Sequence, residues 1–253
     1  MYGGGHARGH DLVIRPAPEL WLFLSSRRRR RRFTVHHDGD ASLGHVVQSA
    51  GIPLTEVGSL TAGGREVDPA HRPGAGAVIG IGQVSRPQRM PGSTGFLLDV
   101  HLGTLARRLR LLGIDTAYRN PADDDALVQQ AAREHRVLLT QDRGLLMRRA
   151  LRAGAYVRGA RPAGQLTDVV ERFAPSLAPR TRCTACNGDL VAVSKDEVLK
   201  ELEPGTRRDY DRFARCGSCG RVYWYGAHGR GLDAIVEAAR AALARTGASG
   251  NGR

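Results

Sequence analysis

The sequence predicts an α/β protein made of three modules in a row. The first part of the chain carries short apolar runs around one helical pattern, the middle alternates strand and helix patterns, and the last part holds two Cys-x-x-Cys pairs. A length of 253 residues is enough for two or three small domains, and 41% hydrophobic with 25% charged residues is an ordinary globular balance. The chain has no run of about 18 apolar residues, so we expect no membrane-spanning helix.

The first module is expected over residues 18–84 as a small mixed sheet with one helix. Residues 1–17 are rich in Gly, His and Pro, which predicts disorder ahead of it. Ser42 precedes a helical pattern that stops at Gly51. Two strands, a helix and then further strands is the order of a β-grasp sheet. Apolar runs predict the strands over 19–24, 33–36, 57–60 and 77–81.

The second module is expected over residues 95–175, after a linker rich in Pro, Gly and Ser. Strand patterns alternate with helix patterns and the loops between them are short, which is typical of a parallel sheet covered by helices. The expected strands are 96–99, 115–118, 137–140 and 155–157, and the expected helices are 102–112, 123–132, 145–151 and 165–173.

Acidic residues follow two strands of this module. Asp99 and Asp142 each come just after an apolar strand, and residues 123–125 are three aspartates at the start of a helix. The carboxyl ends of parallel strands form one edge of a sheet, so we expect these carboxylates to lie close together. Such a cluster suits Mg²⁺ or Mn²⁺, which can activate water for attack on a phosphodiester. The alternative is that Asp123 only caps its helix and Asp125 is a favourable first-turn charge.

The third module is expected over residues 180–231 and contains two cysteine pairs, Cys183-x-x-Cys186 and Cys216-x-x-Cys219. This spacing lets four thiolates hold one zinc ion, and such a closed site is structural because no coordination position stays open. The 29 residues between the pairs (187–215) exceed the usual gap of about 15–20. They fit a zinc ribbon with a helical excursion over 195–202 and 207–213. A redox-active disulfide is the alternative.

A terminal amphipathic helix and tail are expected over residues 232–253, with the end fraying from residue 246. The net charge of the whole chain is +13, and it is spread over all thirds of the sequence. Such a charge favours a polyanionic partner, most simply RNA or DNA, although Arg-rich usage is also explained by a GC-rich genome. Around the cysteines, cations and aromatic rings suit single-stranded RNA, with Arg215, Arg221, Tyr223 and Trp224 as candidates. The alternative for Tyr223 and Trp224 is a place in the core of the small module.

Several blocks of the chain resemble a known family. Residues 96–99, 101–103, 105–113 and 115–116 resemble the opening of the Mut-seven C-terminal RNase domain, a PIN-like nuclease fold. Residues 123–127 and 138–143 resemble its next two blocks, and residues 194–198 and 223–226 resemble its zinc-ribbon tail. Residues 41–43, 51–53, 55–57 and 72–74 resemble the ubiquitin-like domain often fused in front of it.

This resemblance implies a metal-dependent ribonuclease. Its metal-binding acids would be Asp99, Asp124 and Asp142, with Asp125 as the substitute for Asp124. A fourth acid is common in such nucleases, and Asp168 is the candidate here. Arg107 and Arg143 are candidate phosphate contacts, with an alternative role as surface helix residues.

The expected protein is thus cytoplasmic, because paired cysteines and the absence of a signal-peptide pattern argue against secretion. It would use Mg²⁺ or Mn²⁺ for catalysis, Zn²⁺ for structure and RNA as its partner. The alternative is a non-catalytic RNA-binding adaptor. The ubiquitin-like module does not end in Gly-Gly, so we expect it to bind RNA or another protein or to pack against the nuclease. The run of arginines over 27–32 is either a solvated loop or part of an RNA-binding face.

Overall fold

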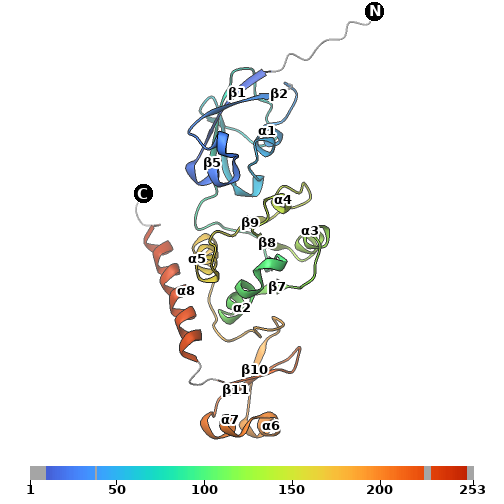
Figure 1. Cartoon of the computed structure of the whole chain (residues 1–253), viewed down its shortest axis with the longest axis vertical. Helices are drawn as coiled ribbons and strands as arrows, with labels where there is room; N and C mark the ends of the chain where they lie inside the picture. The colour runs from blue at the N-terminus through green and yellow to red at the C-terminus, as the bar shows by residue number, and fades with distance from the viewer. Residues whose placement is uncertain (1–9, 38, 225–228, 250–253) are drawn as a thin grey trace, which may run out of the picture. The chain divides into compact units, whose positions relative to one another are not determined.

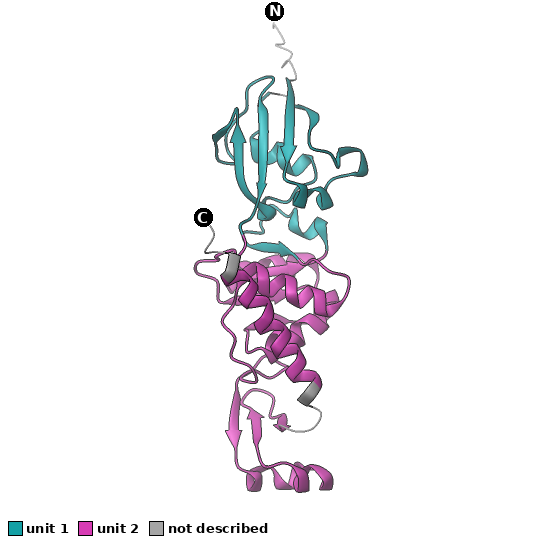
Figure 2. Ribbon diagram, turned by 90° about the vertical axis from the view of Figure 1, so that its left-hand side faces the viewer, with its two compact units in different colours: residues 1–85, 142–156 teal, residues 86–141, 157–253 magenta. Residues whose placement is uncertain are grey.

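The computed structural model describes residues 10–37, 39–224 and 229–249 (Figure 1). The chain divides into two compact units, drawn in different colours in Figure 2. Unit 1 contains residues 1–85 and 142–156, and unit 2 contains residues 86–141 and 157–253. The segment 142–156 therefore groups with the N-terminal unit, although it lies in the middle of the sequence. Within the described part, no helix is both long and apolar enough to cross a membrane.

The N-terminal segment of unit 1 contains a five-stranded mixed sheet and the α-helix α1 (Leu43–Ser49). The strand order is β2-β1-β5-β3-β4, with β1 parallel to β5 and the other pairs antiparallel. This confirms the β-grasp prediction. The strands are β1 (His10–Pro16), β2 (Phe33–His37), β3 (Val57–Ala62), β4 (Arg65–Glu66) and β5 (Val78–Gln83).

Two predictions for unit 1 are wrong. Residues 10–16 were expected to be disordered, but they form β1, whose alternate residues Leu12 and Ile14 are fully buried. The run 19–24 was expected to be a strand, but Pro18–Phe23 is a 3₁₀ helix (η1). A proline at its start and buried Leu20 and Phe23, three residues apart, suit that helix.

The helix α1 is bounded as its sequence predicts. Ser42 caps it by accepting a hydrogen bond from the backbone N–H of His45, and Gly51 follows with φ of 106°. At its C-terminus, the Arg28 guanidinium donates to the carbonyls of Ser49 and Ala50. A cation at that end is favourable, because helix carbonyls there lack intrahelical partners.

The segment 142–156 begins with α4 (Arg143–Leu146) and ends with the short strand β9 (Gly154–Tyr156). The helix expected over 145–151 is therefore shorter and lies earlier in the sequence, because α4 begins at Arg143 and ends at Leu146. Within unit 1, the Tyr156 N–H donates to the Glu56 carboxylate at 2.7 Å, and the Tyr156 ring packs edge-on against Phe23. Glu56 is 2% exposed, so a buried carboxylate from the β-grasp domain holds this segment.

Unit 2 contains three parallel strands with helices between them. Phe96, Leu97 and Leu98 pair with the strands on both sides and are buried, as are Val137 to Leu139. Strands buried on both faces read as continuous apolar runs, which is why the sequence predicted them. The strands are β6 (Gly95–Leu98), β7 (Thr116–Tyr118) and β8 (Arg136–Thr140), with β6 between the other two.

The α-helices of this part of unit 2 are α2 (Gly103–Leu111), α3 (Asp124–Arg133), α5 (Pro162–Phe173) and α8 (Gly229–Ser249). Helix α8 packs along α5 (Figure 1) and buries Val236, Ala239 and Ala242. It continues to Ser249, so the prediction that the chain frays from residue 246 is wrong for 246–249; residues 250–253 lie outside the described part.

The cysteine-bearing part of unit 2 is an antiparallel three-stranded sheet in the order β10-β11-β12. Its strands are β10 (Leu190–Val193), β11 (Phe213–Cys216) and β12 (Val222–Trp224). The long gap between the cysteine pairs is filled by α6 (Lys195–Val198), η5 (Leu199–Glu201) and α7 (Pro204–Asp209), which confirms the helical excursion. The second helix lies earlier than expected, because Phe213 belongs to β11 and packs with Val198 and Leu202.

Candidate metal centre and acidic strand ends

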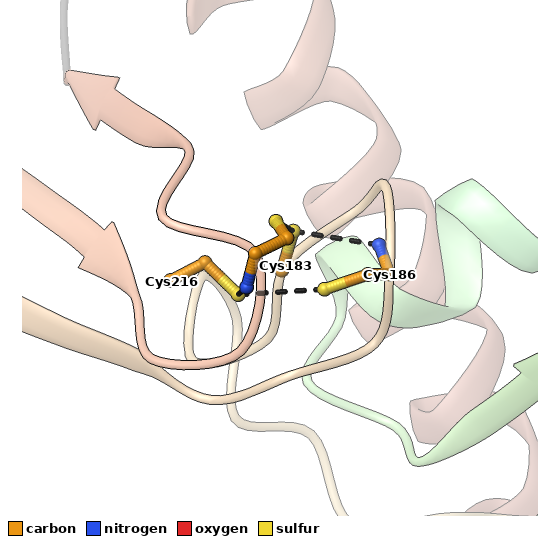
Figure 3. Close-up of side chains that lie close together, drawn as sticks. Cys183, Cys186 and Cys216 are labelled. Atoms are coloured by element: carbon orange, nitrogen blue, oxygen red, sulfur yellow. Dashed lines mark hydrogen bonds between the residues drawn. The ribbon is translucent and has the colours of Figure 1, made fainter.

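The sulfur atoms of Cys183, Cys186, Cys216 and Cys219 all lie within 4.8 Å of one another. Cys183 and Cys186 lie before β10, Cys216 ends β11, and Cys219 lies in the turn to β12. The labelled side chains of Cys183, Cys186 and Cys216 point toward one another in Figure 3, and the Sγ atoms of Cys186 and Cys216 are 3.4 Å apart. All four are free thiols, and four thiolates at this spacing suit a structural zinc ion.

The two cysteine pairs are built in the same way. In each, the N–H of the second cysteine donates to the sulfur of the first at 3.5 Å. In each, the next residue has a left-handed backbone: Asn187 with φ of 75° and Gly220 with φ of 73°. Gly188 is also required, because a Cβ there would lie 2.9 Å from the Cys216 sulfur. We name these turns the first knuckle (Cys183–Gly188) and the second knuckle (Cys216–Arg221).

The thiols differ in their electrostatic surroundings. Burial raises the pKa of Cys183, but hydrogen bonds from the Tyr223 hydroxyl and from backbone N–H groups outweigh it and lower the pKa to about 6. Desolvation and the shared hydrogen bonds with the other three thiols raise the pKa of Cys186 to about 12. Four thiols in contact thus cannot all ionise easily without a cation between them.

A buried arginine joins the first knuckle to the parallel α/β part of unit 2. Arg110 on α2 is 3% exposed and donates to the carbonyl of Thr116 at 2.9 Å and to those of Thr184 and Ala185 at 3.3 and 2.8 Å. The Asn187 side chain makes a second link, since it accepts from the Thr116 N–H. These contacts fix the knuckle against β7.

Asp115 extends this link. Its carboxylate accepts from Asn187 at 3.0 Å and forms ion pairs with Arg136 at 2.5 Å and Arg182 at 3.2 Å. Burial raises the pKa of Asp115, but the hydrogen bonds from Arg136 and Asn187 outweigh it and hold the pKa below its usual range. The carboxylate is therefore a stable anion that fixes three partners.

Asp99 lies directly after β6, as predicted, and is 6% exposed. One carboxylate oxygen accepts from the Val100 N–H at 2.5 Å, and the other accepts from the Thr140 hydroxyl at 2.6 Å. Thr140 is itself buried at the end of β8. The side chain of Asp99 is thus held in one orientation by a neighbouring strand.

The acidic run 123–125 has a mixed role. Asp123 accepts from the Ala126 N–H at 2.7 Å and is the N-cap of α3, as the capping alternative predicted. Asp124 and Asp125 form the first turn of that helix, where negative charge is favourable; Asp124 is half-buried and Asp125 is exposed.

Asp142 is exposed and caps α4 by accepting from the Gly144 N–H at 2.6 Å. It belongs to unit 1, whereas Asp99 and Asp124 belong to unit 2. In the part of the chain that the structure describes, the side-chain group suited to a metal ion consists of the four cysteines, and neither Asp99 nor Asp124 lies in such a group. The shared acidic site stays a prediction.

The predicted phosphate and RNA contacts fall into two sets. Arg107 on α2, Arg143 on α4, Arg221 and Trp224 are exposed, with Trp224 45% exposed. Arg215 instead pairs with Glu201 at 2.6 Å, and Tyr223 directs its hydroxyl to Cys183 at 3.0 Å. The matched pattern 223–226 runs on into residues 225 and 226, which lie outside the described part.

Asp168, the candidate fourth acid, is buried in α5 and has structural partners. It forms an ion pair with Arg86 at 2.7 Å and accepts from the Arg158 N–H at 2.8 Å. Sequence reasoning did not find Arg110, Asp115, Thr140 or Asn187, because the partners that give them their roles are far away in the sequence. The one available signal is Asn187 directly after Cys186, where a left-handed residue is common.

The described residues thus form a parallel α/β domain joined to a four-cysteine ribbon, together with a β-grasp domain. The family model of the Mut7-C RNAse domain matches residues 94–236, and that of the Mut7-C ubiquitin domain matches residues 10–89. The chain therefore belongs to the Mut7-C RNase family, which confirms the resemblance. The second match includes β1 from its first residue. No curated protein and no solved structure matches the chain.

Proposed function

We propose that this protein is a metal-dependent ribonuclease that hydrolyses RNA phosphodiester bonds. The observation that carries the proposal is the Mut7-C RNAse domain match over residues 94–236, which includes Asp99 at the carboxyl end of β6. Ligands bind at the carboxyl ends of strands in parallel α/β sheets, so Asp99 lies where the reaction is expected.

Asp99 is suited to holding a cation there. Its two oxygens each accept one hydrogen bond, from Val100 and Thr140, and each keeps a further lone pair. Asp99, Asp124 and Asp142 are the residues that would hold Mg²⁺ or Mn²⁺, which supplies water activation and charge neutralisation at the phosphodiester. Thr140 keeps Asp99 in position, and the exposed Arg107 is the proposed phosphate contact on the following helix.

The ribbon has two proposed roles. The four cysteines hold a structural Zn²⁺, supported by their mutual distances and by the matching knuckles. The exposed Arg221 and Trp224 bind RNA through phosphate attraction and base stacking. Free cysteines also support a location in the reducing cytoplasm.

The experiment measures the rate at which a labelled single-stranded RNA is cleaved in the presence of Mn²⁺. It compares the wild type with the variants Asp99→Asn, Asp124→Asn and Asp142→Asn. We expect each variant to lose at least about 100-fold in rate, because each removes a charge that holds the cation. Asp123→Asn is the matched control: it is the next residue to Asp124, and asparagine also caps helices, so it should cleave as the wild type does.

Unchanged cleavage by all three variants would exclude the proposed acidic site. RNA binding by the wild type without cleavage under Mg²⁺ or Mn²⁺ would instead favour a non-catalytic RNA-binding adaptor. Thermal unfolding of each variant separates loss of activity from loss of fold.

A further inference from the structure

A polar cavity of about 450 Å³ lies in unit 2 beside helix α3. It runs from the end of β7, at Tyr118 and Arg119, along α3 to Cys186 and Asn187 of the first knuckle. Its volume falls in the range of about 300–1,000 Å³ that is common for small-molecule sites, and it suits a nucleotide unit. The acidic residues and the RNA contacts predicted from the sequence do not line it.

The chemistry of the cavity wall favours an anion with polar edges. Arg119 is exposed after β7, and Arg133 is exposed on α3 one turn after Gln129. The acidic lining residue, Glu134, forms ion pairs with Arg136 at 2.8 Å and with the exposed Arg133 at 3.3 Å. Guanidinium groups bind phosphate, and a glutamine amide can donate to and accept from a base edge.

The cavity begins at the strand ends where the proposed reaction takes place. Leu98 of β6 and Tyr118 of β7 are register partners in the parallel sheet. Asp99 and Arg119 are the next residues on these adjacent strands, so both lie at the carboxyl edge. An RNA strand that enters the cavity at Arg119 therefore starts beside the end of β6, which Asp99 directly follows.

The other end of the cavity is held rigidly. Asn187 is fixed by its hydrogen bonds to Asp115 and Thr116, and the first knuckle is fixed by Arg110. A preformed wall lowers the entropic cost of binding. The ribbon thus shapes a binding site together with α3, in addition to presenting its own exposed side chains.

We propose that this cavity binds a nucleotide unit of single-stranded RNA, with Arg119 and Arg133 on its phosphates and Gln129 at a base edge. The proposal deepens the ribonuclease function proposed above and rests on it for the choice of RNA. In this proposal, α3 and the first knuckle bind the part of the RNA that lies next to the reacting phosphodiester.

The test is the affinity for a short fluorescein-labelled single-stranded RNA, measured by anisotropy without added Mg²⁺ or Mn²⁺. The full chain with Asp99→Asn is the background, so that no cleavage occurs. We expect Arg119→Ala with Arg133→Ala to raise Kd about ten-fold and to reduce the slope of log Kd against log salt by about 0.7 for each lost phosphate contact. Arg240→Ala, which removes one exposed arginine on α8, should change Kd less than about two-fold.

An unchanged Kd and salt slope in the double variant would overturn the proposal, as would an equal loss in Arg240→Ala. Circular dichroism of the double variant controls for folding. The two proposals fail separately. If the wild type cleaves RNA and the double variant binds RNA normally, only the proposal about the cavity is excluded. If the wild type does not cleave RNA and the double variant binds RNA poorly, only the proposed ribonuclease activity is excluded.

Discussion

The guanidinium of Arg110 donates to the backbone carbonyl of Ala185 at 2.8 Å, although the residues are 75 positions apart. This bond connects helix α2 to the first cysteine knuckle. Because Arg110 also donates to Thr116 on β7, one side chain holds the α/β sheet and the ribbon together. The ribbon is therefore a structural part of the RNase domain, in agreement with the single family match that covers both.

Arg110→Ala should lower the free energy of unfolding by about 2–4 kcal/mol. The substitution leaves the carbonyl of the buried Thr116 without the Arg110 donor and removes the packing of a long side chain. Urea unfolding followed by circular dichroism measures the change. Arg107→Ala, on the exposed face of the same helix, should stay within about 0.5 kcal/mol of the wild type. Equal stability of the two variants would contradict the role given to Arg110.

The purified protein should contain about one zinc ion per chain by elemental analysis. Cys216→Ser should lose the metal and unfold the small core of Val198, Leu202 and Phe213, because zinc-binding energy in such modules is folding energy. Ser218→Ala, in the same knuckle, is the control and should keep the zinc. A zinc-free protein with a folded ribbon would show that the four cysteines serve another purpose.

Asp115 should make unit 2 sensitive to acid. Its pKa is lower in the folded state than in the unfolded chain, where it is about 3.9. Its stabilising contribution is thus complete above that value and is lost as the pH falls through the lower, folded-state pKa. Asp115→Asn should therefore be less stable than the wild type at neutral pH, with a difference that shrinks in acid.

Urea midpoints measured from neutral pH down to about pH 3 test this for Asp115→Asn. The control is Asp211→Asn, which removes an exposed partner of Lys195 and should change stability little at any pH. A stability difference for Asp115→Asn that grows on acidification would have the wrong sign for a depressed pKa.

Glu56 should hold the segment 142–156 within unit 1. Glu56→Ala leaves the half-buried Tyr156 N–H without its acceptor, so the amides of this segment should exchange with solvent faster. Glu56→Gln keeps an acceptor oxygen and should exchange more slowly than Glu56→Ala. Hydrogen exchange read by mass spectrometry measures both. Identical exchange in the wild type and in Glu56→Ala would mean that the bond contributes nothing to holding the segment.

Local patterns predicted those features that depend on neighbouring residues. The Cys-x-x-Cys spacing predicted that all four cysteines lie together. The apolar runs of β6 and β8 predicted strands, because these strands are buried on both faces. The run 19–24 was misassigned, because a short apolar run has no period that separates a strand from a 3₁₀ helix. Residues 10–16 were missed because their Gly- and His-rich surroundings hid a short alternating strand.

The contacts that fix the sites were not predictable from local patterns. Arg110 is one of many arginines in its helix, and only the fold brings Thr184 and Ala185 to it. Thr140 gains its role from Asp99, 41 residues earlier, and Glu56 contacts a segment 100 residues later. Such pairs are set by how strands and domains pack, and the sequence carries no spacing signal for them.

The central claim is that Asp99, Asp124 and Asp142 hold the catalytic cation. Its most direct test is a titration of the zinc-loaded protein with Mn²⁺, in which electron paramagnetic resonance measures Mn²⁺ binding. The account predicts that the wild type binds Mn²⁺ and that Asp99→Asn and Asp142→Asn each weaken this binding at least about ten-fold, while Asp123→Asn does not. Wild-type Mn²⁺ affinity in both Asp99→Asn and Asp142→Asn would contradict it.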